Sequence, residues 1–77
     1  MQVDAKEIID IIVIYAKSNH EISENTKILE TGLIDSINVI QIIAEIEARM
    51  NIKISSMDLV FDDFETPLKL RDALRKL

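Results

Sequence analysis

The sequence predicts an all-α fold: a small bundle of three main helices and one short helix, with a long loop between the first two helices. Three observations predict it. Apolar residues recur at helical spacing in three segments of the chain. Two of these segments open with start signals, an Asp-x-x-Glu capping box at Asp4 and Glu7 and the dipeptide Thr66-Pro67. The 77 residues contain one Gly and one Pro and suffice for one core, so we expect a single domain over residues 1–77.

The composition excludes several kinds of protein and site. The chain has no Cys, which excludes a disulfide scaffold, a Cys-ligated metal site and a thiol of its own. Its longest apolar run, residues 11–16, is far shorter than the ~20 residues of a membrane span, so we expect a cytoplasmic protein that is not membrane-embedded. The net charge is −5, and residues 67–77 hold four of the nine bases against one acid. The acidic remainder disfavours nucleic acid; it either favours partners with basic surfaces or serves solubility alone.

The first half of the chain predicts one helix and one loop. The helix should begin near Asp4, and its segment 8–16 is apolar nearly all round, which fits a helix packed between others. The β-branched run 11–14 also fits a strand, but the length and the cap favour a helix. Residues 18–35 lack periodicity and predict a long loop pinned to the core by its apolar residues. In that loop Gly32 should supply a backbone conformation that other residues avoid.

The second half predicts three helices. The first of them should span residues 36–50, with a core face made of Val39, Ile42, Ile43, Ile46 and Met50 and with Ile40 at its edge. After an extended link over residues 52–54, Ser55 or Ser56 should cap a short helix that ends at Val60 or Phe61. The last helix should start at Pro67 behind the N-cap Thr66.

The segment Gly32-Leu33-Ile34-Asp35-Ser36-Ile37 places a lone serine at the start of a predicted helix. Residues Ile28 to Ile54 resemble the attachment-site region of acyl and peptidyl carrier proteins, in which the serine of a Gly-x-x-Asp-Ser-[Leu/Ile/Phe] motif carries a 4′-phosphopantetheine arm. The resemblance implies an acyl-carrier-like bundle with the arm on Ser36. It also implies that Asp35 is both a helix cap and a recognition residue for the phosphopantetheinyl transferase, which would use coenzyme A and Mg²⁺. The positive end of a helix dipole suits the phosphodiester that would form there.

A docking surface is predicted next to this serine. Ile37, Ala44 and Ala48 fall on one stripe of the second helix, opposite the core face, and we expect partner enzymes to dock there. Glu45 and Glu47 beside the stripe should steer a basic partner. The alternative is that these are isolated surface apolar residues with no role.

No metal site is predicted. His20 is interpreted as an inert loop residue, and Asp62 with Asp63 as a solvated turn.

The resemblance implies a carrier that other enzymes modify and load, not an enzyme. It would hold an acyl or aminoacyl group as a thioester. We expect a monomer with three kinds of partner: the transferase, an adenylating ligase or acyltransferase that loads the cargo, and a downstream acceptor enzyme.

Two patterns bear on the cargo. The second helix has no acid before Glu45, unlike typical carriers of fatty acid synthesis. The tail Asp62-Asp63-Phe64-Glu65-Thr66-Pro67 resembles that of D-alanyl carrier proteins, which serve teichoic acid modification. A carrier of fatty acid, polyketide or nonribosomal peptide synthesis is the alternative. An alternative of another class is an acidic helical adaptor without a prosthetic group, in which Ser36 stays unmodified.

Overall fold

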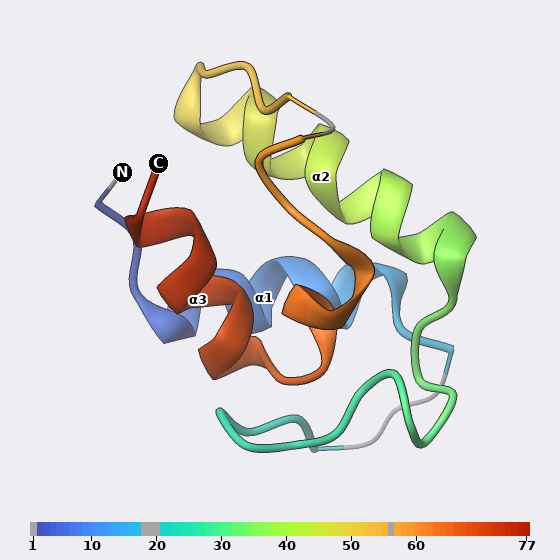
Figure 1. The fold of residues 1–77 in the computed structure, drawn as a ribbon. Coiled ribbons are helices and arrows are strands. Elements are labelled where there is room, and N and C mark those ends of the chain that lie inside the picture. Colours follow the sequence, from blue (N-terminus) through green and yellow to red (C-terminus); the bar gives the residue numbers. More distant parts are fainter. Residues whose placement is uncertain (1, 18–20, 56) are drawn as a thin grey trace.

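The computed structural model describes residues 2–17, 21–55 and 57–77. In chain order the elements are α1 (Ala5–Tyr15), α2 (Ser36–Met50), the short 3-10 helix η1 (Phe61–Phe64) and α3 (Pro67–Arg75). No strand occurs in the described ranges. The prediction of three main helices, one short helix and a long connection between the first two is therefore confirmed (Figure 1). Within the same residues, no helix is both long enough and apolar enough to cross a membrane.

The first and last helices begin at the caps that the sequence predicts. The Asp4 carboxylate accepts a hydrogen bond from the Glu7 N–H at 3.0 Å, and the Thr66 hydroxyl accepts one from the N–H three residues later at 3.1 Å, with Pro67 at the first helical position. The return bond of the predicted capping box, from the Asp4 N–H to the Glu7 side chain, does not form. A single accepted amide thus suffices to start α1.

Helix α1 lies between the other two long helices and contacts both, and η1 contacts α2 and α3 (Figure 1). The buried core between them is aliphatic except for one aromatic ring, that of Phe64. Its members are Val3, Ile8, Ile11, Ile12, Ile22, Ile28, Leu33, Ile34, Val39, Ile42, Ile46, Ile54, Leu59, Phe64, Leu70 and Leu74.

The connection between α1 and α2 is fixed to the core, as its apolar residues predict. Four of them are buried: Ile22, Ile28, Leu33 and Ile34. Main-chain bonds join the connection to the segment around Thr66, because the Ile28 N–H donates to the Glu65 carbonyl and the Leu68 N–H donates to the Glu24 carbonyl, both at 3.0 Å. Gly32 has a φ of +77°, the left-handed conformation that glycine adopts without strain.

Two helices are less covered than predicted. Helix α1 is not packed on all sides: its neighbours bury Ile8, Ile11 and Ile12, while Val13 and Ile14 are 53% and 55% exposed. On α2, Ile40 is 68% exposed instead of lying at the edge of the core, and Ile43 is only partly buried. The neighbours of α2 pack on the face of Ile42 and leave the opposite side open.

The short helix starts later than predicted. Ser55 closes a single turn instead of capping a helix: its carbonyl accepts the Asp58 N–H at 2.9 Å, and the chain is extended again at Val60. The helical turn begins only at Phe61, where the Asp63 carboxylate accepts the Val60 N–H at 2.8 Å. A carboxylate inside the turn therefore does the capping that the sequence analysis assigned to a serine before it.

Candidate functional site at the start of helix α2

Ser36 is the first residue of α2, and it is exposed. Its neighbours cap the helix. The Asp35 Oδ1 atom accepts the N–H groups of Ile37 and Asn38, both at 3.0 Å, and the Asn38 Oδ1 atom accepts the Asp35 N–H at 3.0 Å. These bonds form a complete capping box and leave the Ser36 hydroxyl without a hydrogen-bond partner in the described part of the chain. The hydroxyl is thus held at the surface on an ordered helix start.

The other oxygen of Asp35 pairs with a lysine at the end of α1. The Lys17 Nζ atom lies 2.6 Å from Asp35 Oδ2, and the Lys17 N–H donates to the Leu33 carbonyl at 2.8 Å. The hydrogen bond from Lys17, with a smaller contribution from the Asn38 N–H, holds the pKa of Asp35 below its ordinary value of 3.8. Asp35 is therefore ionised at neutral pH, and both of its oxygens are occupied as acceptors.

This arrangement is compatible with an anionic group on Ser36. The helix dipole places partial positive charge at the start of α2, and Lys17 balances the negative charge of Asp35 beside the serine. Asp35 is poorly suited to act as the base for Ser36, because its pKa is lowered and both of its oxygens already accept hydrogen bonds. We therefore expect a partner enzyme to bring the base.

The outward face of α2 is apolar where it begins. Ile37 is 66% exposed, and Ala44 and Ala48 are exposed, as their helical spacing predicts. Ile40, 68% exposed, lies next to Ile37 on the same face. We call Ile37, Ile40, Ala44 and Ala48 the outer strip. No charged residue occurs between Ser36 and Ala44, so the outer strip is uncharged where it meets the serine.

Glu45 and Glu47 both have partners within the protein. Glu45 accepts the Tyr15 hydroxyl at 2.9 Å and the Arg49 Nε–H at 2.8 Å, and so links α1 with α2. The bond from Arg49, followed by that from Tyr15, lowers the pKa of Glu45, and the bond to Glu45 raises the pKa of Tyr15. Glu47 Oε2 accepts the Ile54 N–H at 2.8 Å. Both carboxylates thus support the fold, and their role in steering a partner stays a prediction.

The acidic pair Asp62 and Asp63 forms the middle of η1, where the Asp63 carboxylate accepts the Val60 N–H. Among the described residues, no three side chains of the metal-binding types gather at one place. His20 and the cap candidate Ser56 lie outside the described residues.

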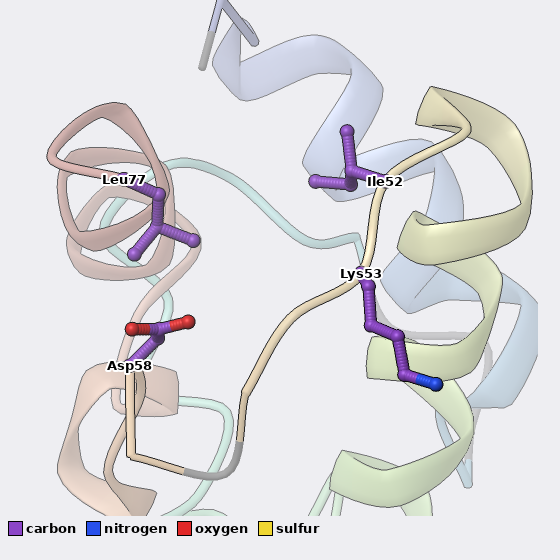
Figure 2. A pocket seen from close by; sticks show the side chains of 4 residues that line it. All are labelled: Ile52, Lys53, Asp58 and Leu77. Atoms are coloured by element: carbon purple, nitrogen blue, oxygen red, sulfur yellow. The ribbon is translucent and has the colours of Figure 1, made fainter.

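A pocket of about 480 Å³ lies away from this site, between the segment that follows α2 and the end of the chain (Figure 2). It is lined by Ile52, Lys53, Asp58 and Leu77. None of these is a predicted site residue. Because α2 is about 22 Å long at 1.5 Å per residue, Ile52 and Ser36 lie at its opposite ends. The pocket is therefore separate from the serine.

Three residues of the site were not predicted from the sequence. Asn38 had a local signal, because an Asn three residues after an N-cap can complete a capping box. The position of Ile40 on the helix, outside the core face, could have predicted its exposure. No sequence pattern predicts the role of Lys17, because its ion pair with Asp35 joins the residues after one helix to the cap of the next.

A comparison with known protein families agrees with this geometry. Residues 6–74 match the family model described as a phosphopantetheine attachment site. The match runs from the first turn of α1 to the last turn of α3 and includes every residue of the cap around Ser36. The family binds a covalently attached 4′-phosphopantetheine.

Proposed function

Because the chain belongs to the phosphopantetheine attachment site family, we propose that Ser36 bears the 4′-phosphopantetheine arm of a single carrier domain over residues 1–77. Domains of this family are typically carriers and not catalysts. The observation that supports Ser36 is its exposed hydroxyl, which stands at the capped start of α2 and has no hydrogen-bond partner among the residues that the structure describes. The cap fixes the main chain on both sides of that hydroxyl.

In the attachment reaction Ser36 is the nucleophile and Asp35 orders the helix start that presents it. The Ser36 Oγ atom forms a bond to the phosphorus next to the pantetheine in coenzyme A, and the bond from that phosphorus to the adenosine bisphosphate breaks. The Ser36 proton passes to a base of the phosphopantetheinyl transferase, which also supplies Mg²⁺. Asp35 orders the first turn of α2, and the helix dipole favours the new phosphodiester. The bound arm supplies the thiol that this chain lacks and that holds the cargo as a thioester.

We propose the outer strip as the surface that partner enzymes contact. It lies on the same helix as Ser36, and apolar helix faces of this kind are recognised by complementary grooves. The partners are the transferase, the ligase or acyltransferase that loads the cargo, and the enzyme that accepts it. Glu45 and Glu47 would steer a basic partner from the margin of the strip. We propose that the carrier acts as a cytoplasmic monomer.

For the cargo we propose a small amino acid, with D-alanine as the first candidate. The uncharged stretch from Ser36 to Ala44 supports this choice, as does the resemblance of the tail to D-alanyl carrier proteins. The tail carries the weaker argument, because Phe64 is a core residue and Thr66 is a helix cap, roles that any carrier of this fold needs. The uncharged helix surface next to the proposed attachment site is therefore the stronger argument for the cargo.

The experiment that tests the proposal is incubation with coenzyme A, Mg²⁺ and a broad-specificity phosphopantetheinyl transferase, followed by intact mass. We expect the wild-type chain to gain one phosphopantetheine and Ser36→Ala to gain none while keeping its helical circular dichroism. The matched control is Ser55→Ala, a change at another exposed serine, which should be modified like wild type.

Two results would decide against Ser36. An alanine variant that still gains the mass places the arm on another residue. A wild-type chain that never gains it, under conditions that modify a known carrier, favours the adaptor without a prosthetic group, which would use the same outer strip.

A further inference from the structure

Lys17 makes two contacts with the segment that leads into Ser36. Its N–H donates to the Leu33 carbonyl at 2.8 Å, and its Nζ atom lies 2.6 Å from Asp35 Oδ2. We propose that Lys17 is a positioning residue for attachment of the arm: by holding Asp35 it keeps the start of α2 in the form that the transferase recognises. This inference rests on the proposed function of Ser36.

The two carboxylate oxygens of Asp35 have different partners. Oδ1 accepts the N–H groups of Ile37 and Asn38, while Oδ2 faces Lys17. With the lysine removed, no side chain in the described ranges fixes Oδ2. The carboxylate is then free to turn about its last bond and to exchange its oxygens at the cap. The order of the first turn, and with it the placement of the Ser36 hydroxyl, depends on that carboxylate.

The pair is too exposed to act mainly through stability. The side chains of Lys17 and Asp35 are 54% and 42% exposed, and exposed ion pairs contribute little to the free energy of unfolding. An effect on orientation does not need a large contribution to stability. It needs only that the recognised conformation becomes a smaller fraction of the population, which weakens the apparent affinity of the transferase by that fraction.

The variants follow from this geometry. Lys17→Met removes the charge and keeps the main-chain bond to Leu33, and Lys17→Arg restores a cation. Lys6→Met is the matched control, because Lys6 also pairs with an aspartate, Asp10, at an exposed place on α1 that is away from Ser36. Asp35→Asn, alone and combined with Lys17→Met, tests whether the lysine acts through the aspartate.

The measurements are the kcat and KM of arm attachment by intact mass, and the carboxyl pKa of Asp35 by carbon NMR. For Lys17→Met we expect a roughly three- to tenfold higher KM with kcat within about twofold. We also expect a pKa of Asp35 closer to its ordinary value. Lys17→Arg should restore both, and Lys6→Met should change neither. In the Asp35→Asn background, Lys17→Met should have no further effect.

Three outcomes would overturn the inference: a KM for Lys17→Met equal to that of Lys6→Met, a deficit that Lys17→Arg shares, or an equal effect of Lys17→Met with and without Asp35. Each of these leaves Ser36 as the attachment site. A wild-type chain that is not modified, or is modified elsewhere, is a failure of the proposed function instead.

Discussion

Asp35 combines two roles that usually fall to different residues. One oxygen caps α2 and the other receives Lys17 from the end of α1, so a single carboxylate joins the start of one helix to the end of another. All of its donors favour the ionised form, which is why its pKa is lowered even though the side chain is partly exposed. Ionised Asp35 therefore connects the segment that presents Ser36 to Lys17, which follows α1.

This lowered pKa predicts how stability depends on pH. The ionised carboxylate is favoured by the fold, so its contribution is present above the ordinary pKa of 3.8 and is lost as the pH falls through the lower pKa of the folded state. The stability advantage of wild type over Asp35→Asn should be constant near neutral pH and shrink below about pH 4. Urea unfolding of both proteins from pH 7 to pH 3 measures it.

Asp10→Asn is the control for the loss of one carboxylate, at an exposed position of α1. The assignment of the effect to Asp35 fails if the advantage over Asp35→Asn keeps the same size down to pH 3, or if Asp10→Asn gives the same pH profile.

At the residue scale, the sequence predicts what local spacing can show. Asp35 as a cap, Gly32 in a left-handed turn and Ser36 at the helix start all follow from neighbours within a few positions. The pair of Lys17 and Asp35 does not, because it exists only once α1 and α2 have packed and the loop between them has folded back.

At the scale of the helix, α2 has two apolar faces, one buried and one exposed. One face is buried by Val39, Ile42 and Ile46 against the core. The opposite face is the outer strip, which keeps large apolar side chains in contact with water at Ile37 and Ile40. Two exposed isoleucines side by side are a cost for a free monomer, and a partner that covers them would remove it.

Substitutions on the two faces of α2 should separate stability from docking. Ile46→Ala should cost about 2–5 kcal/mol of unfolding free energy, because Ile46 is fully buried, and Ile43→Ala should cost less, because Ile43 is only partly covered. Ile37→Asp should change stability by less than about 0.5 kcal/mol, because the position is exposed. Urea unfolding measures all three variants.

The same variants test docking through the rate of arm attachment. Ile37→Asp should slow it, while Ile43→Ala should not at temperatures where it is folded. Equal rates for Ile37→Asp and wild type would remove the outer strip from the docking proposal. Equal destabilisation by Ile37→Asp and Ile46→Ala would contradict the orientation of α2.

The prediction of elements is best where caps and periodicity agree. The predicted bounds of α2, residues 36–50, are those observed, since Asp35 caps one end and Asn51 turns left-handed at the other. The short helix is misplaced because Ser55 and Asp63 are both plausible caps in the sequence. In the structure the helical turn is the one that buries Phe64 in the core, and Asp63 accepts the Val60 N–H at its start.

At the scale of the whole molecule, charge is separated along the chain. Residues 67–77 hold four of the nine bases and only one acid. One of these bases, Arg75, donates to the Val3 carbonyl at 3.0 Å and so joins the last helix to the segment before the first. The acids spread over the rest, but the stretch from Ser36 to Ala44 holds none. An approaching enzyme thus meets an acidic body in which Ser36, the proposed attachment site, is bordered by an uncharged helix surface.

This distribution predicts which enzymes load the holo-protein. The malonyl transferase and the ketosynthase of fatty acid synthesis dock through basic patches, and on α2 such patches would find acids only from Glu45 onward, where the carboxylates already have partners. Each missing exposed pair is worth only ~0.2–1 kcal/mol, but several missing together, with weaker electrostatic steering, reduce turnover markedly. We therefore expect an ATP-dependent adenylating ligase to charge the holo-protein with D-alanine in preference to malonyl transfer. Competition between a D-alanine ligase and a malonyl transferase for the purified holo-protein, read by intact mass, compares the two directly. Efficient malonyl loading without any aminoacyl thioester would refute the D-alanyl assignment, while modification at Ser36 would be unaffected.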